Sequence, residues 1–89
     1  MSEQVESAKD QIREFVLETA RRKGIKEVTD EESVTKNGII DSLAIFRLVS
    51  FLEDTFRLKI ADEEISNENF ASVNEIDKFV AAKLAAKKA

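Results

Sequence analysis

Cysteine, histidine and proline are all absent from this 89-residue sequence, and glycine occurs only at Gly24 and Gly38. Without cysteine the chain can form neither a disulfide nor a thiolate metal site. Without histidine, the usual base of Cys–His and Ser–His catalysis is missing. Acid–base catalysis would then need a carboxylate or lysine with a shifted pKa, so the sequence predicts a protein with little chemistry of its own and no thiolate metal site. Any reactive group that it uses is expected to come from a cofactor or from a partner enzyme.

The shortage of turn residues favours long helices, because strand-rich folds usually need more glycine and proline. With 89 residues, of which 43% are hydrophobic, the chain is long enough for one domain over 1–89 and no more. No stretch approaches the roughly 20 apolar residues that span a bilayer, and the N-terminus is too polar for a signal peptide. We therefore expect an all-α, cytoplasmic, monomeric protein without membrane insertion.

Apolar residues at helical spacing predict a first helix over roughly residues 3–23, which Gly24 ends. Residues 25–40 have weak periodicity and predict a long loop. A second helix is expected over about 42–56, and a short helix over 67–71. Ser72 and Glu75 have the spacing of a capping box and predict the start of the last helix. The predicted architecture is a four-helix bundle of three longer helices and one short helix, with a long loop between helices one and two.

The net charge of −4 is spread unevenly along the chain. Residues 1–40 carry nine acids and seven bases, residues 41–77 carry nine acids and three bases, and the tail from Lys78 carries four lysines and no acid. The acidic middle disfavours nucleic acid as a partner and suits docking to basic protein surfaces.

The most informative segment is 38–43, in which Ser42 follows a glycine-containing loop and begins a predicted helix. Asp41 is a good N-cap, because its carboxylate can accept hydrogen bonds from the free amides of the first turn. A serine at a helix start is often only a cap. Alternatively, a phosphodiester on Ser42 would lie at the positive end of the helix dipole, which is favourable for an anion.

The stretch 38–56, which reads GIIDSLAIFRLVSFLEDTF, resembles the acyl carrier protein family. Asp41, Ser42 and Leu43 match the family's phosphopantetheine attachment motif, in which Ser42 is the attachment site. The downstream stretch IADEEISNENFASVNEIDKFV is similar to the family's acidic connection, short third helix and capped last helix. The resemblance covers nearly the whole chain in order and spacing.

The resemblance implies a carrier that holds acyl groups as thioesters on a 4′-phosphopantetheine arm. A phosphopantetheinyl transferase would move this arm from coenzyme A onto Ser42. The other implied partners are acyl-transferring, condensing or ligase enzymes. Asp41 is a candidate to help hold the divalent metal and coenzyme A within the transferase, although capping alone would also explain it.

Two further groups of residues follow from the resemblance. An apolar interior beside the second helix is expected to shelter the acyl chain, with ordinary core packing as the alternative; its candidates are Phe46, Val49, Leu52, Ile65, Phe70 and Ile76. An exposed face is expected to dock partner enzymes; its candidates are Ala44, Arg47, Glu53, Asp54, Asp62 and Glu63. Because Arg47 stands where fatty-acid carriers usually have an acid, we hypothesise a dedicated fatty-acid or polyketide-type pathway.

Two alternatives remain open from the sequence. The first is an aminoacyl or peptidyl carrier of the D-alanyl type, which would keep the role of Ser42. The second is a cofactor-free helical adaptor, in which Ser42 is only a helix cap.

The charge of Arg47 gives a first test. Because a guanidinium repels the basic patch of a general fatty-acid enzyme, Arg47→Glu should improve loading of the carrier by such enzymes. The measurement is the initial rate of acyl loading for the two proteins. Equal rates would remove the support for a dedicated pathway.

Overall fold

Three α-helices carry the fold in the computed structural model, which describes residues 7–88. They are α1 (Ala8–Arg22), α2 (Ser42–Phe56) and α3 (Val73–Lys88), and a single 3-10 turn, η1 (Asp62–Glu64), lies between α2 and α3. No strand is present over residues 7–88, so the all-helical prediction is confirmed. None of these helices is long and apolar enough to cross a bilayer.

Helix α1 begins later than the sequence pattern predicted. Ser7 has an extended conformation and its side chain accepts a hydrogen bond from the Asp10 amide at 3.1 Å, so the helix begins at residue 8. Positions 3–6 of the predicted helix lie outside the described residues. A stripe at i, i+4 and i+8, formed by Ile12, Val16 and Ala20, is fully buried. Gly24, with φ of 83°, follows the helix as predicted.

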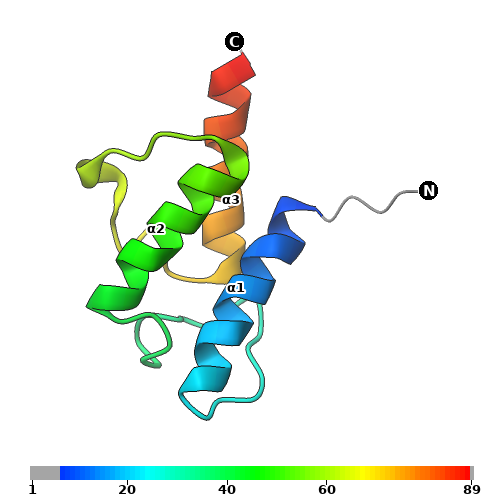
Figure 1. Cartoon of the computed structure of the whole chain (residues 1–89), viewed down its shortest axis with the longest axis vertical. Coiled ribbons are helices and arrows are strands. Elements are labelled where there is room, and N and C mark those ends of the chain that lie inside the picture. The colour runs from blue at the N-terminus through cyan, green and yellow to red at the C-terminus, as the bar shows by residue number, and fades with distance from the viewer. Residues whose placement is uncertain (1–6, 89) are drawn as a thin grey trace, which may run out of the picture.

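The three helices surround one apolar core. In Figure 1, α1 runs downward while α2 and α3 run upward. Helix α1 packs against both α2 and α3. Helix α2 contributes Leu48, Val49 and Leu52 to this core. Ser72 caps α3, because its hydroxyl accepts a hydrogen bond from the Glu75 amide at 3.2 Å. The predicted caps of α2 and α3 are therefore both present.

The short helix predicted over 67–71 is not formed, so a four-helix bundle is not found in the part of the chain that the structure covers. Residues 67–70 form a hydrogen-bonded turn instead. Two side chains compete for the local backbone: Ser66 Oγ accepts from the Asn69 amide at 3.2 Å, and Asn69 Nδ2 donates to the Glu64 carbonyl at 2.9 Å. Serine and asparagine favour such turns over continued helix.

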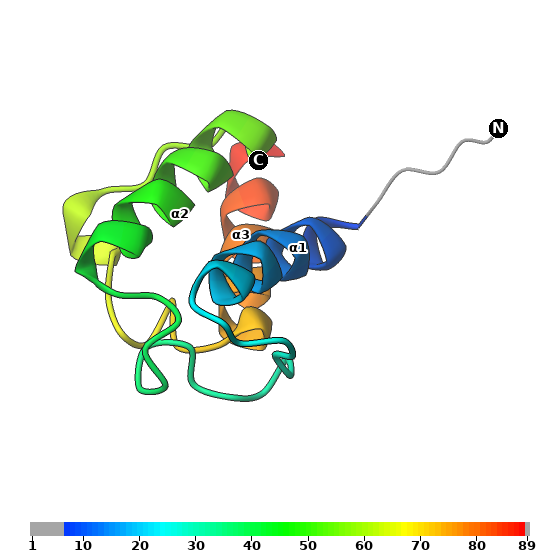
Figure 2. The same cartoon turned by 60° about the horizontal axis from the view of Figure 1, so that its bottom comes forward.

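The long loop between α1 and α2 is held to the core at several points. Val34 and Ile39 are fully buried, and Ile40 is 3% exposed. The Val34 amide donates to the Ala71 carbonyl at 2.8 Å, and the Ile40 amide donates to the Val34 carbonyl at 2.9 Å. Figure 2 shows the loop passing below the end of α1 and the start of α3 before it reaches α2. The loop thereby fixes where α2 begins.

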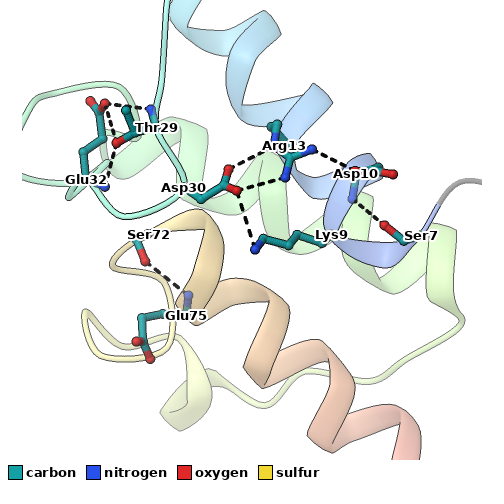
Figure 3. A network of polar contacts seen from close by, with 9 residues as sticks. All are labelled: Ser7, Lys9, Asp10, Arg13, Thr29, Asp30, Glu32, Ser72 and Glu75. Atoms are coloured by element: carbon teal, nitrogen blue, oxygen red, sulfur yellow. Dashed lines mark hydrogen bonds and ion pairs between the residues drawn. The ribbon is translucent and has the colours of Figure 1, made fainter.

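A cluster of charged side chains ties the same loop to α1 (Figure 3). The guanidinium of Arg13 donates two hydrogen bonds to Asp30, from Nε to Oδ1 and from Nη2 to Oδ2, both at 2.9 Å. Its Nη1 donates to Asp10 at 2.7 Å, and Lys9 lies 3.5 Å from Asp30. The hydrogen bonds from Arg13 lower the pKa of Asp30. A bidentate arginine–carboxylate pair of this kind is stronger than one with a single hydrogen bond.

Removal of the guanidinium should loosen the loop. We expect Arg13→Met to lower the free energy of unfolding by about 1 kcal/mol, a modest value because Arg13 is partly exposed. Arg21→Met is the matched control, since Arg21 is exposed on the same helix and forms no ion pair with any described residue. Urea denaturation of the three proteins at neutral pH measures the difference.

The same pair predicts a pH dependence. Because the pKa of Asp30 is lower in the folded chain than in the unfolded chain, its contribution is present at neutral pH and is lost as the pH falls below about 4. The difference between the natural protein and Arg13→Met should therefore shrink in acid. A difference that stays constant from pH 7 to pH 3 would show that Asp30 is not the partner that matters.

Candidate functional site

The start of α2 is organised by Asp41, which is the N-cap of the helix. Its backbone is extended, and its Oδ1 accepts hydrogen bonds from the amides of Leu43 at 3.1 Å and Ala44 at 2.8 Å. Ser42 is the first residue of the helix and is exposed. The Ser42 hydroxyl makes no hydrogen bond to any residue of 7–88. The fold therefore uses Asp41 as the cap and leaves Ser42 unused.

Lys23, at the end of α1, holds this capping residue from the other side. Its Nζ donates to Asp41 Oδ2 at 2.9 Å and to the Gly38 carbonyl at 2.8 Å. Both carboxylate oxygens of Asp41 are thus engaged within the protein. The hydrogen bond from the Ala44 amide, followed by the one from Lys23, lowers the pKa of Asp41. Asp41 is therefore ionised at neutral pH, as its cap and ion pair require.

An apolar groove of about 300 Å³ lies beside Ser42. Its lining combines two isoleucines near the start of α2, two apolar side chains from the segment before α3, and five polar residues. The lining residues are Thr35, Ile40, Asp41, Ser42, Ile45, Ile65, Ser66, Asn67 and Phe70. Ser42 is the only one of them that carries an exposed hydroxyl on α2. A flexible chain attached to this hydroxyl would have apolar surface within reach.

The structure separates the six residues that the sequence assigned to an acyl pocket. Ile65 and Phe70 line the groove beside Ser42. Val49, Leu52 and Ile76 are buried in the closed core. Phe46 is 60% exposed, which corrects its expected place in the interior. The reason is its position on α2, where Ile45 and Val49 turn inward and Phe46 turns to the solvent face.

The residues expected to dock partners differ in their exposure. Arg47, Asp54, Asp62 and Glu63 are exposed, as a docking face requires. Ala44 is only 8% exposed and packs into the core, so its expected exposure is wrong. The carboxylate of Glu53 is partly used by the fold, because its Oε2 accepts from the Ile60 amide at 2.9 Å.

Sequence reasoning missed three residues of this site, namely Lys23, Ile40 and Ile45. Lys23 was missed because nothing in the sequence indicates that its partner, Asp41, lies 18 positions away along the chain. The two isoleucines lie just before the motif and two positions after it, each next to another apolar residue, so the sequence contained no separate signal for a groove lining. By contrast, Leu43 of the motif is 63% exposed, which leaves a large apolar side chain beside Ser42.

No protein-family model matches the chain, and no curated protein matches it. Within residues 7–88, no cluster of three or more acidic residues could hold a metal ion. The site is therefore interpreted from its own geometry: an exposed, unused serine hydroxyl, a fixed helix start and an adjoining apolar groove.

The double role of Asp41 predicts a local effect of its replacement. Asp41→Ala should raise the hydrogen-exchange rates of the Leu43 and Ala44 amides several-fold, because both lose their acceptor. Asp41→Asn should raise them less, since its amide oxygen can still accept. The amide of Ile76 in α3 serves as the internal control. Equal exchange rates in all three proteins would contradict the capping role.

Proposed function

We propose that this protein is an acyl carrier protein, which receives a 4′-phosphopantetheine arm on Ser42 and presents acyl groups to biosynthetic enzymes. One observation carries the proposal: the Ser42 hydroxyl is exposed and makes no hydrogen bond within residues 7–88, while Asp41 caps the helix in its place. A serine that served only as a cap would accept from the amides that Asp41 occupies. This distribution of roles disfavours the cofactor-free adaptor.

The surroundings of Ser42 suit a phosphodiester. The first residue of a helix has an amide without a partner inside the helix, and the positive end of the dipole favours an anion there. The aliphatic part of an attached arm would have Ile40, Ile45 and Phe70 beside it in the groove. When bound, the arm supplies the thiol that carries the acyl group as a thioester, and the chain has no cysteine of its own for that purpose.

The chain's own part in its modification is limited to Ser42. In the proposed transfer, Ser42 Oγ forms a bond to phosphorus while the pyrophosphate bond of coenzyme A breaks and adenosine 3′,5′-bisphosphate leaves. The hydroxyl proton passes to a base of the transferase, because this chain has no histidine. Asp41 would not easily act as that base, since both its oxygens already accept hydrogen bonds.

The same proposal places docking on the exposed residues around Ser42. Leu43 and Phe46 offer apolar contact area, and Arg47 adds a positive charge beside them. Exposed apolar side chains of this size typically mark interaction sites. The positive charge supports a dedicated fatty-acid or polyketide-type pathway. We further propose that the carrier acts as a monomer in the cytoplasm.

The decisive test is modification of the purified protein. After incubation with coenzyme A and a broad-specificity phosphopantetheinyl transferase, intact mass spectrometry should show the gain of one phosphopantetheinyl group. Ser42→Ala should show none. Ser50→Ala is the matched control, since it removes another exposed serine of α2 and should be modified like the natural protein.

Two results would overturn the proposal. One is a Ser42→Ala protein that still gains the arm. The other is a natural protein that several competent transferases leave unmodified although circular dichroism shows it to be folded.

A further inference from the structure

A second and larger hollow, of about 580 Å³, lies between α1 and α2. It is lined from α1 and its end by Phe15, Glu18, Thr19, Arg22 and Lys23, and from the start of α2 by Asp41, Leu43, Ala44 and Arg47. We name this hollow the α1–α2 cleft. Asp41 and Leu43, the residues on either side of Ser42 in the sequence, both line this cleft, whereas Ser42 itself lines the groove described above.

The α1–α2 cleft has a positive charge, in contrast to the chain as a whole. It contains three bases and two acids, which gives +1, whereas the whole chain carries −4. Lys23 is paired with Asp41 at 2.9 Å. Arg22 and Arg47 form no ion pair with any residue of the described chain, and both are exposed. Two guanidinium groups, one from each helix, are therefore available to a ligand.

Apolar surface accompanies these charges. Phe15 stacks on Phe51 of α2 with ring centroids 4.8 Å apart, so the aromatic ring is held in place. Ala44 is buried, and Leu43 is 63% exposed. Concave hollows of 300–1,000 Å³ that combine apolar walls with a few polar groups are typical of small-molecule sites. The cleft thus suits a ligand with an apolar body and an anionic end.

We propose that the α1–α2 cleft binds an acyl group that ends in a carboxylate and is carried on Ser42. The carboxylate pairs with Arg47 and Arg22, and the methylene chain lies against Phe15 and Leu43. A guanidinium matches a carboxylate with two parallel hydrogen bonds, which makes arginine selective for this end group. The inference rests on the proposed carrier function and names its cargo class: acyl groups with a free acid at the far end.

The two hollows would then bind different acyl groups, according to the group at the far end of the acyl chain. The groove beside Ser42 is lined by four apolar residues and by Asp41 as its one charged residue, and it contains no basic side chain. An uncharged acyl chain is therefore expected to stay in this groove. A carboxylate placed there would lose its hydration without gaining a cation, so it is more stable in the cleft.

The absence of cysteine allows a test that needs no transferase. Ser42→Cys creates a single thiol, to which two tethers of the length of the pantetheine arm are attached chemically. Both end in the same six-carbon chain, one with a terminal carboxylate and the other with a terminal carboxamide. Amide chemical shifts of the ¹⁵N-labelled protein report where each tether lies.

With the carboxylate tether we expect shifts at Thr19, Ala44 and Arg47, and a lowered pKa of the ¹³C-labelled terminal carboxylate. With the carboxamide tether the cleft amides should not shift. Arg47→Met and Arg22→Met should each weaken the occupancy of the cleft about tenfold, the scale of one charge-assisted hydrogen bond. Arg21→Met is the matched control and should change nothing, because Arg21 does not line the cleft.

Three results would overturn the inference. The first is equal cleft shifts for both tethers, and the second is no cleft shift with either. The third is an Arg47→Met protein that binds the carboxylate tether as well as the Arg21→Met control does. Since the tethers are attached without an enzyme, these three results would not affect the mass test of Ser42 modification. A failed mass test would overturn the carrier function but would not change the measured position of the tethers.

Discussion

The structure depends on burial of apolar side chains from the long loop between α1 and α2. Residues 25–40 have no helix of their own, so tertiary contacts must add to the hydrogen bonds within the loop to order them. Val34, Ile39 and Ile40 supply these contacts, and each side chain of this kind contributes about 1.5–3 kcal/mol when it leaves water. The loop ends directly at Asp41, so its burial also decides where the exposed serine is presented.

Polar contacts add to the apolar burial in holding the loop between α1 and α2. Arg13 ties the loop to the middle of α1 through Asp30, and Lys23 ties its end to the last turn of the same helix through Asp41. One helix therefore holds the loop at two places. Because Asp41 also caps α2, the position of the loop and the start of the helix are coupled. Ser42 remains chemically free as a result, which is the feature that the proposed modification requires.

Two hollows near the start of α2 differ in charge. The groove beside Ser42 contains no basic side chain, whereas the α1–α2 cleft brings together three basic residues in an otherwise acidic protein. Long-range charge steers partners, but cargo is distinguished by short-range pairing in a concave site. In the carrier that we propose, the residues around the attachment point would select the acyl group.

The sequence by itself determined the helical class, the caps at Asp41 and Ser72, the long loop over residues 25–40 and the serine at the start of α2. These features are local, because spacing and capping chemistry act within a few residues. Only the tertiary structure decided that Phe46 faces the solvent, that Ala44 is buried and that residues 67–70 form a turn. It also decided that Lys23 pairs with Asp41 and that Arg22 and Arg47 line one cleft. Such pairings join residues far apart in the chain, and they exist only after the core has packed.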